Sequence, residues 1–237
     1  MQLDLGGDHR TDILRRSQEA LIERFGRIIR PPEKRRSPEW VLVHGVIGAQ
    51  TKTAASNAST DGLLAEFGSW EAVAELSEEA LEKRLQRQSF PSVAAKRLKA
   101  CLQAIIAERG SVSLAHLSNL PLEEAMAWLE TLPGVARKNS AGVMNASSFD
   151  RKAMVIDGHH RRIMQRMGVV PPKADTGKTY DALMPIVPGE WSAADMDEHH
   201  LLLKKLGQTF CRPRSPKCEG CPVREDCEMG TRQVARG

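Results

Sequence analysis

The chain has 237 residues, of which 41% are hydrophobic and 27% are charged, and 34 basic against 30 acidic residues give a formal net charge of +4. This balance is typical of a globular protein and excludes a fibrous or disordered one. No run of 18 apolar residues occurs, and the first residues lack the apolar core of a secretory signal. We therefore expect a cytoplasmic protein without a transmembrane helix.

Helical patterns follow one another along almost the whole chain, and strand patterns are short and few. Serine and aspartate residues that can cap helices, and glycine residues that can end them, mark the boundaries. The fold is predicted to be mostly α. The expected helices begin after Ser37, Ser69, Ser77, Asp157 and Ser192, and others cover 54–67, 94–107 and 122–132; the helix after Ser192 is expected to stop near Gly207.

Linker-like segments over 30–37, 149–153 and 169–175 indicate where blocks of the chain join. A boundary near residue 150 would separate a compact helical block, residues 31–150, from a C-terminal block that carries most of the cysteines. Basic residues gather over 27–36, 151–152, 161–162 and 212–217. The net charge is a weak hint of a polyanionic partner, and each of these patches alone is more typical of solvated surface.

Four of the five cysteines, Cys211, Cys218, Cys221 and Cys227, are spaced C-x6-C-x2-C-x5-C. Thiols packed so closely are either disulfide partners or ligands of one metal centre, and a reducing compartment disfavours disulfides. Four thiolates suit zinc or an iron–sulfur cluster. Zinc ribbons usually show two short knuckles, whereas this chain has one between longer arms. The spacing therefore favours a cluster and leaves zinc open.

The stretch from Leu132 to Lys138, LPGVARK, predicts a helix, a tight Pro-Gly turn and a second helix. Such a turn leaves backbone N–H groups at the new helix's N-terminus, where they can hold a phosphate. The functional interpretation is a helix-hairpin-helix that grips a nucleic-acid backbone. The alternative is an αα-hairpin that only turns the chain.

The β-branched pair Val155-Ile156 leads into Asp157, which begins a predicted helix to Met167. As an N-cap, Asp157 would satisfy backbone amides, and the positive end of the helix dipole would keep its carboxylate ionised. A capping role and a catalytic role are compatible.

Four motifs, in this order along the chain, carry a resemblance to a known family: GAQTKT at 48–53, LPGVARK at 132–138, IDGHHRR at 156–162 and the cysteine pattern. The chain resembles the endonuclease III family of DNA glycosylases, within the helix-hairpin-helix glycosylase superfamily, over roughly residues 20–230. The resemblance implies a six-helix barrel with the hairpin over 31–150, and a second domain from 1–30 plus 151–237 that holds a 4Fe–4S cluster on the four cysteines.

The same resemblance implies a bifunctional DNA glycosylase and abasic-site lyase of base-excision repair. It would act as a monomer on double-stranded DNA, in the bacterial nucleoid if the source is bacterial. Lys138 would be the nucleophile and Asp157 its electrostatic and acid–base partner, facing each other across a DNA-binding cleft. A buried core glutamine for Gln50 and a solvated helical lysine for Lys138 are the alternatives. The implied DNA contacts are Gln50, Gly134, Ala136, Arg137, His159, Arg212, Arg214 and Lys217.

Some positions depart from the family pattern. Ala136 stands where the hairpin usually has its second glycine, Gly158 replaces a threonine, and His160 replaces an apolar residue. The segment 89–91 matches the family's second wedge loop poorly, so the sequence does not place that wedge. These changes surround the base pocket and put the usual oxidised-pyrimidine substrate in doubt.

Two other functions compete with this prediction. The first is a relative with altered base choice, such as a mismatch-specific thymine or uracil glycosylase. The second is a non-catalytic DNA-binding protein that carries the cluster. Lys138, and a chain that ends soon after Cys227, argue against the adenine-mismatch branch of the family.

Overall fold

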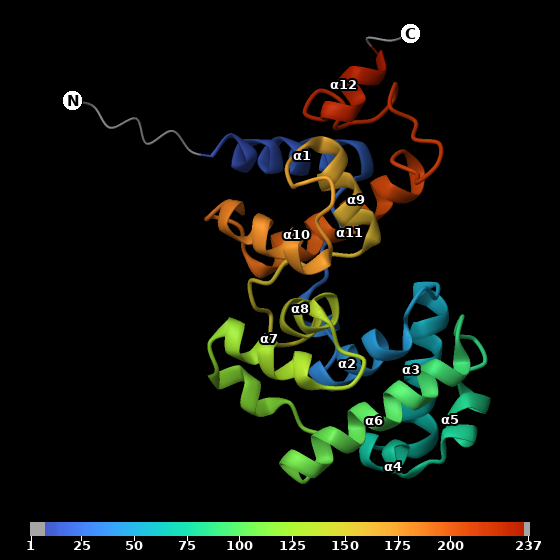
Figure 1. Ribbon diagram of the computed structural model, residues 1–237. Helices are drawn as coiled ribbons and strands as arrows, with labels where there is room; N and C mark the ends of the chain where they lie inside the picture. Colours follow the sequence, from blue (N-terminus) through green and yellow to red (C-terminus); the bar gives the residue numbers. More distant parts are fainter. Residues whose placement is uncertain (1–7, 235–237) are drawn as a thin grey trace. The chain divides into compact units, whose positions relative to one another are not determined.

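A computed structural model describes residues 8–234 and divides the chain into two compact units (Figure 1). The hairpin unit is Lys34–Arg151, and the terminal unit combines the described residues up to Glu33 with those from Lys152 onward. The prediction of a mostly α fold is confirmed. Expectations for 1–7 and 235–237 fall outside the described residues. Across 8–234, no helix is long and apolar enough to cross a membrane.

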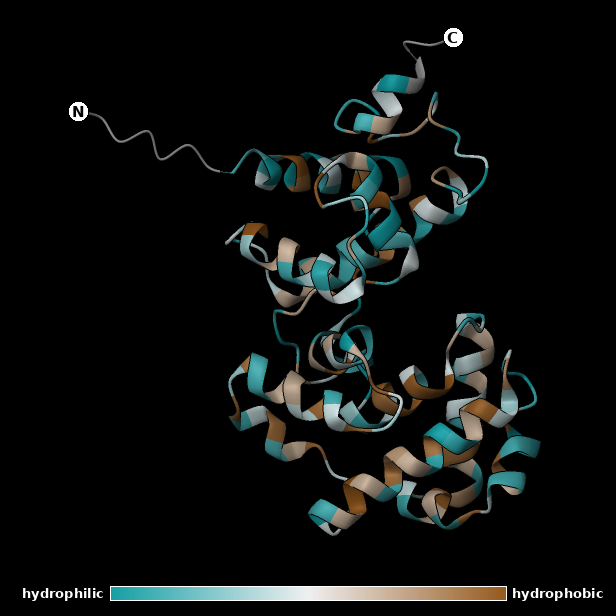
Figure 2. Cartoon of the chain, viewed as in Figure 1, coloured by the Kyte–Doolittle hydropathy of each residue, from teal (hydrophilic) through white to brown (hydrophobic). Residues whose placement is uncertain are grey.

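The hairpin unit is built around α2, which contacts α3, α6 and α8. Its core is apolar: Leu42 and Val43 of α2 and Leu98 and Leu102 of α6 are buried. Apolar and polar residues alternate along the α6 ribbon in Figure 2, as expected for a helix with one buried face. The helices are α2 (Pro38–Ile47), α3 (Thr53–Phe67), α4 (Trp70–Glu75), α5 (Glu78–Arg84), α6 (Pro91–Arg109), α7 (Leu122–Thr131) and α8 (Arg137–Ala146), with 3₁₀ turns η1 (Pro32–Lys34), which begins in the other unit, and η2 (Ala115–Asn119).

The terminal unit is centred on α11, which contacts α1 and α9, and α9 in turn contacts α10 and α12. Leu14 and Leu21 of α1 and Leu202 and Leu206 of α11 are buried between these helices. The helices are α1 (His9–Phe25), α9 (Gly158–Met167), α10 (Thr176–Leu183), α11 (Ala193–Thr209) and α12 (Glu228–Val234), with the 3₁₀ turn η3 (Met184–Ile186).

The predicted caps are confirmed. The side chains of Ser37, Ser69 and Ser77 each accept a hydrogen bond from a backbone N–H in the first turn of the next helix. Ser192 and Asp195 form a reciprocal capping box. Each such cap contributes about 1 kcal/mol to helix stability. Sequence signals therefore set most helix starts in this chain.

The helix α11 ends at Thr209, two residues beyond Gly207, near which its end was expected. Gly207 serves a different purpose. A Cβ built on it would lie 2.4 Å from Nδ1 and 2.8 Å from Cβ of His159, which belongs to α9. The missing side chain lets α9 pack directly on the backbone of α11, and this contact fixes the helix that Asp157 caps.

We predict that Gly207→Ala destabilises the terminal unit by about 1–3 kcal/mol, because the added methyl group forces α9 and α11 apart. Gly177→Ala is the matched control, since its Cβ would meet only an ordinary contact at 3.6 Å inside α10. Native-state hydrogen exchange of α9 and α11 amides measures the difference. Equal protection in the two variants would contradict the packing argument.

Candidate functional site

The turn between α7 and α8 is a tight hairpin. Leu132 caps α7, and the Val135 N–H donates to the Leu132 carbonyl at 3.1 Å. Gly134 has a φ of +80°, in the left-handed region that glycine adopts without strain. The Arg97 side chain lies 3.2 Å from where a Cβ on Gly134 would be. Glycine is therefore required here for its backbone and for its lack of a side chain.

Ala136, by contrast, needs no glycine. Its φ of −125° and ψ of 172° are extended, a conformation open to any residue. It is the N-cap of α8, yet it supplies no side-chain cap to that helix. A helix N-terminus of this kind suits a phosphate, because its backbone N–H groups and dipole both favour an anion.

Glu130 of α7 holds the first turn of α8. Its carboxylate accepts hydrogen bonds from Arg137 Nε and from Ser140 Oγ, each at 2.6 Å. The charge of Arg137, an implied DNA contact, is thus offset within the hairpin unit. Lys138, the second residue of α8, is exposed.

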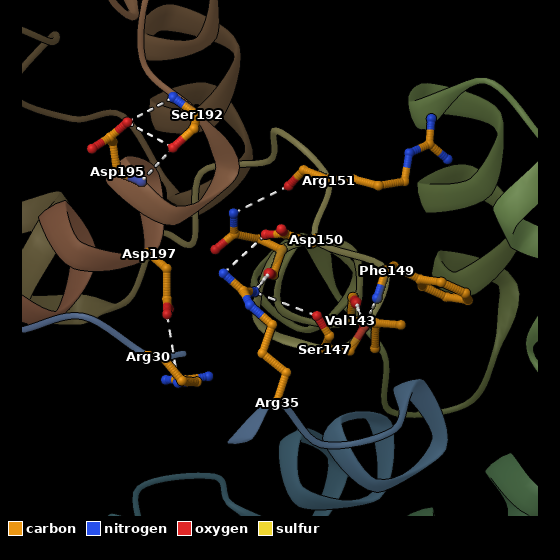
Figure 3. Close-up of polar contacts among 11 residues, drawn as sticks. Arg30, Arg35, Val143, Ser147, Phe149, Asp150, Arg151, Ser192, Asp195 and Asp197 are labelled. Atoms are coloured by element: carbon orange, nitrogen blue, oxygen red, sulfur yellow. Dashed lines mark hydrogen bonds and ion pairs between the residues drawn. The ribbon is translucent and has the colours of Figure 1, made fainter. Parts of the chain in front are cut away.

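Arg35 holds the other end of α8 (Figure 3). Its side chain is only 2% exposed, and its guanidinium donates to the carbonyls of Asn145 and Ser147 and pairs with Asp150 at 2.9 Å. A cation at a helix C-terminus satisfies the last carbonyls and complements the dipole. With both ends fixed, α8 presents Lys138 from a rigid element.

Gln50 lies in the loop between α2 and α3. It is exposed, with a φ of +54°, which excludes the alternative of a buried core glutamine. The loop is tied to the start of α6: Ser89 Oγ donates to the Gln50 carbonyl at 2.9 Å, and the Ser89 N–H donates to Thr51 Oγ1 at 2.9 Å.

An apolar pocket of about 510 Å³, open to solvent, lies beside Gln50. Phe90, which the sequence did not assign, forms one wall and is 50% exposed. Arg97 lines the same pocket and also covers Gly134. One surface of the hairpin unit therefore joins the Gln50 loop, an exposed aromatic ring and the hairpin.

Asp157 is the predicted N-cap of α9. One of its carboxylate oxygens accepts from the His159 N–H at 2.8 Å and the His160 N–H at 2.9 Å. Burial alone would raise the pKa of Asp157, but His200, the backbone N–H of His160 and the charges of His160 and His159 together bring this pKa below its ordinary value. The carboxylate is therefore largely removed from water and still ionised.

The residues after Asp157 explain two departures from the family pattern. A Cβ on Gly158 would find no atom within 4 Å, so the space that a threonine would fill is open. His160 is fully buried, and its Nδ1 lies 3.0 Å from the Val155 carbonyl. His159 is half-buried against Gly207, with its Nδ1 3.2 Å from an Arg162 nitrogen.

The four C-terminal cysteines line one pocket of about 370 Å³, next to α9 and the end of α11. Burial first, and then the neighbouring cysteine thiolates, raise the pKa of Cys221 to about 11. Four thiolates in this place therefore need a strong positive counter-charge, which iron supplies when bound. No three His, Cys, Asp or Glu side chains within 8–234 are arranged to hold a single ion. Four cysteine thiols that line one pocket fit a 4Fe–4S cluster, which is held by four thiolates.

Arginines that the sequence did not single out hold the cysteine loop. Arg166 of α9 donates to Cys211 Sγ at 3.3 Å and to the carbonyls of Arg212 and Pro213. Arg16 of α1 pairs with Asp226 at 2.6 Å. The predicted phosphate contacts are all exposed on the loop between the first two cysteines: Arg212, Arg214 and Lys217.

The predicted site residues thus fall into two groups. The hairpin unit brings together Gln50 and the Gly134–Lys138 hairpin, and the terminal unit brings together Asp157, His159 and the cysteine loop. No distinctive sequence pattern marks a buried arginine, an exposed aromatic ring or a glutamate that accepts hydrogen bonds from the first turns of the next helix. Sequence reasoning for that reason missed Arg35, Phe90, Arg97, Glu130 and Arg166.

Three features define a helix-hairpin-helix protein with an iron–sulfur loop. They are the hairpin before the uncapped start of α8, the ionised carboxylate at the N-terminus of α9 and the pocket lined by four thiols. Residues 43–188 match the model of the HhH-GPD superfamily base excision DNA repair proteins, and residues 211–227 match the iron–sulfur binding domain of endonuclease III. The chain belongs to the HhH-GPD superfamily of base excision DNA repair proteins. It is an endonuclease III-like member that binds DNA and carries a 4Fe–4S cluster.

Relatives and solved structures agree with this assignment. The chain is 29% identical to endonuclease III of Rickettsia conorii over 79% of its own length and 82% of the relative's, and 28% identical to that of Escherichia coli over 81% and 84%. Its fold matches a trapped endonuclease III–DNA covalent intermediate with a TM-score of 0.76 at 21% identity, covering 94% and 98% of the two chains. It also matches a thermostable thymine-DNA glycosylase with a TM-score of 0.73 at 19% identity, covering 95% and 100%.

The buried His160 predicts an acid-sensitive terminal unit. Burial lowers its pKa from 6.5 to about 4, so the unfolded chain binds more protons between these values. The free energy of unfolding therefore falls as the pH drops through this window, by about 3 kcal/mol from this residue. His160→Val is expected to reduce this slope, as measured by hydrogen exchange of α9 amides with iron content checked at each pH.

His9→Val changes an exposed histidine of the same unit and serves as the control, which should keep the wild-type slope. A His160→Val protein as acid-sensitive as the wild type would show that this ring is not the group that charges on unfolding.

Proposed function

We propose that the protein is a bifunctional DNA glycosylase and abasic-site lyase that acts as a monomer and excises damaged pyrimidines from duplex DNA. The observation that carries this proposal is the place of Lys138: an exposed primary amine on the second residue of an uncapped helix that follows a phosphate-type hairpin. The alternative, a solvated lysine without a function, gives no reason for an amine directly after this hairpin. The trapped DNA covalent intermediate of a fold relative adds support.

Access to the base requires its extrusion from the duplex, which costs a few kcal/mol and least for damaged or mispaired bases. Gln50 is exposed at the tip of a tied-down loop, and its amide suits pairing with the orphaned opposite base. Two exposed apolar side chains, Phe90 and Val93, line the pocket beside it, and we assign Phe90, the larger and more exposed of the two, as the second wedge. Apolar wedges between base steps are a common means of kinking a duplex.

The excision step places positive charge on the sugar as the base leaves C1′. The ionised Asp157 carboxylate stabilises that charge. The Lys138 amine forms a bond to C1′ as the bond from C1′ to the base breaks, and the departing base takes up the proton that the amine loses. The C1′–O4′ bond of the sugar ring then breaks to give the protonated Schiff base, which acidifies the 2′ proton, so that the 3′ phosphate leaves by β-elimination. A free lysine titrates near about 10.4. Because Lys138 is exposed and Arg137 is paired with Glu130, we infer that covering by DNA activates the amine.

The cluster acts as a structural brace in this scheme. All four thiols are committed to it, which leaves no open position for chemistry on the base. Arg212, Arg214 and Lys217 extend from its first loop, where they suit phosphate contacts that set affinity and salt dependence.

Borohydride treatment of the protein on abasic-site DNA is expected to trap a covalent adduct, because reduction fixes the Schiff base. Lys138→Ala abolishes the adduct, whereas Lys173→Ala, which removes an exposed lysine from a loop, leaves it unchanged. Adducts are measured by gel shift at saturating protein. A wild-type protein that binds this DNA normally but yields no adduct would contradict the lyase and favour the non-catalytic DNA-binding alternative.

Altered base choice is the second candidate function. The observation that favours it is the open space beside Gly158, next to Asp157, which enlarges the region where an extruded base would lie. A pocket with extra room admits bulkier or methylated bases, since pocket shape sets much of the discrimination.

We predict that Gly158→Thr leaves the fold intact, because a Cβ at this position meets no atom within 4 Å, and shifts the preference among substrates toward smaller bases by about tenfold. The measurement is single-turnover excision from a panel of duplexes with oxidised pyrimidines, uracil and mispaired thymine. Gly177→Ala, remote from Asp157 in sequence and on another helix, is the control. An unchanged order of rates across the panel would remove the argument for altered base choice.

A further inference from the structure

The Gln50 loop, residues 48–52 between α2 and α3, holds one residue in a disfavoured backbone conformation. Gln50 has a φ of +54°, in the left-handed region that a glutamine rarely adopts. The turn around it is closed by the Thr51 N–H, which donates to the Gly48 carbonyl at 3.2 Å. A turn closed in this way forms with either sign of φ at its third residue. The closing bond therefore does not explain the conformation of Gln50.

Two peptide planes flank the Cα of Gln50 and set its φ and ψ, and a hydroxyl group holds the carbonyl of each plane. The Thr51 hydroxyl donates to the Ala49 carbonyl at 3.2 Å, which holds the plane before Gln50. Ser89 Oγ donates to the Gln50 carbonyl at 2.9 Å, which holds the plane after it. The Ser89 N–H also donates to the Thr51 hydroxyl at 2.9 Å. Ser89 thus fixes one plane directly and the other through Thr51.

Ser89 can hold the loop because its own neighbours are fixed. Gln88, the residue before it, is 5% exposed, and its side-chain amide joins two serines of α3. Gln88 Nε2 donates to Ser59 Oγ at 2.8 Å, and Gln88 Oε1 accepts from Ser56 Oγ at 3.3 Å. Phe90, the residue after it, is the N-cap of α6. The backbone at Ser89 is therefore anchored to the core of the hairpin unit on both sides.

The same arrangement joins the two side chains that are proposed to enter the duplex. Gln50 and Phe90 line one pocket, and Ser89 bonds to the first and is covalently attached to the second. A loop that is already in its binding conformation loses little backbone freedom when it binds. Bonds that hold Gln50 in place therefore increase the affinity for any DNA that it contacts.

We propose that Ser89 and Thr51 are positioning residues, which hold Gln50 in its left-handed conformation and join the Gln50 loop to Phe90 as one rigid element. The relevance of this element to DNA rests on the proposed contact of Gln50 with the opposite base. The alternative is that the two hydroxyl groups only stabilise the fold, and in that case their loss does not act through Gln50.

Binding of the cluster-loaded protein to a duplex with a stable abasic-site analogue tests the proposal. We expect Ser89→Ala and Thr51→Val each to raise the Kd about fivefold, as for a loop that holds its binding conformation roughly one fifth of the time. Ser89→Thr keeps the hydroxyl group and is expected to bind as the wild type does. Ser111→Ala removes an exposed serine beyond the far end of α6 and is the control, with wild-type affinity.

Combination with Gln50→Ala shows whether the effect passes through Gln50. An alanine at this position has no amide to place, so the loss of either hydroxyl group then has no further effect. The double variants are therefore expected to bind as Gln50→Ala alone does. Losses of affinity that add in full overturn the proposal, and so does wild-type affinity in both Ser89→Ala and Thr51→Val.

Backbone NMR of the DNA-free protein gives an independent test. The couplings and chemical shifts of Gln50 are expected to report a positive φ in the wild type and an average over several conformations in Ser89→Ala and Thr51→Val. A Gln50 backbone that is unchanged in both variants overturns the proposal.

Neither measurement requires base excision, so a protein without glycosylase or lyase activity refutes the proposed function and leaves these tests in force. If Gln50→Ala binds the duplex as tightly as the wild type, the proposed contact of Gln50 with DNA fails. The NMR measurement then still decides whether the two hydroxyl groups hold the loop.

Discussion

The structure depends on keeping one carboxylate ionised where little water reaches it. Removing a charge from water costs several kcal/mol unless hydrogen bonds and opposite charge compensate it. Asp157 meets that requirement through two backbone N–H groups at the start of α9 and through the histidines around it. Because those amides belong to the helix, the orientation of α9 determines where the carboxylate lies. The contact of His159 with Gly207, and the hydrogen bonds from Arg166 to the cysteine loop, both fix that helix.

The hairpin unit carries the other proposed catalytic group, the Lys138 amine. Lysine side chains are flexible, so the precision of Lys138 comes from the helix that bears it. Glu130 secures the first turn of α8 and Arg35 its last carbonyls. The same unit carries the Gln50 loop and Phe90 around Arg97, which contacts the hairpin glycine. Contacts to the phosphate, the opposite base and the sugar are thus proposed to arise from one rigid body.

The sequence predicted those features that local chemistry determines. Serine caps, the Pro-Gly turn and the Asp157 cap follow from hydrogen bonds within a few residues of each other. The spacing of the four cysteines predicts a shared metal centre, and the family resemblance identifies it as a 4Fe–4S cluster. Gly207 shows the limit of such reasoning: its local pattern predicts a helix end, but a tertiary contact with His159 explains the glycine. The contact of the His160 ring with His199, and the tie between Ser89, next to Phe90, and the Gln50 loop, each join residues about 40 positions apart. No local pattern in a single sequence predicts contacts over that separation. The departure at Ala136, in contrast, has no backbone consequence, because its conformation is open to any residue.

The central claim is that Lys138 and Asp157 act on one extruded nucleotide, although they belong to different units. A crystal structure of the protein bound to a duplex with a stable abasic-site analogue tests this claim most directly. The account predicts that C1′ of the analogue lies between Lys138 Nζ and an Asp157 carboxylate oxygen, within about 3.5 Å of each. A sugar that contacts only one of these groups, with the other directed into solvent or into its own unit, would contradict it.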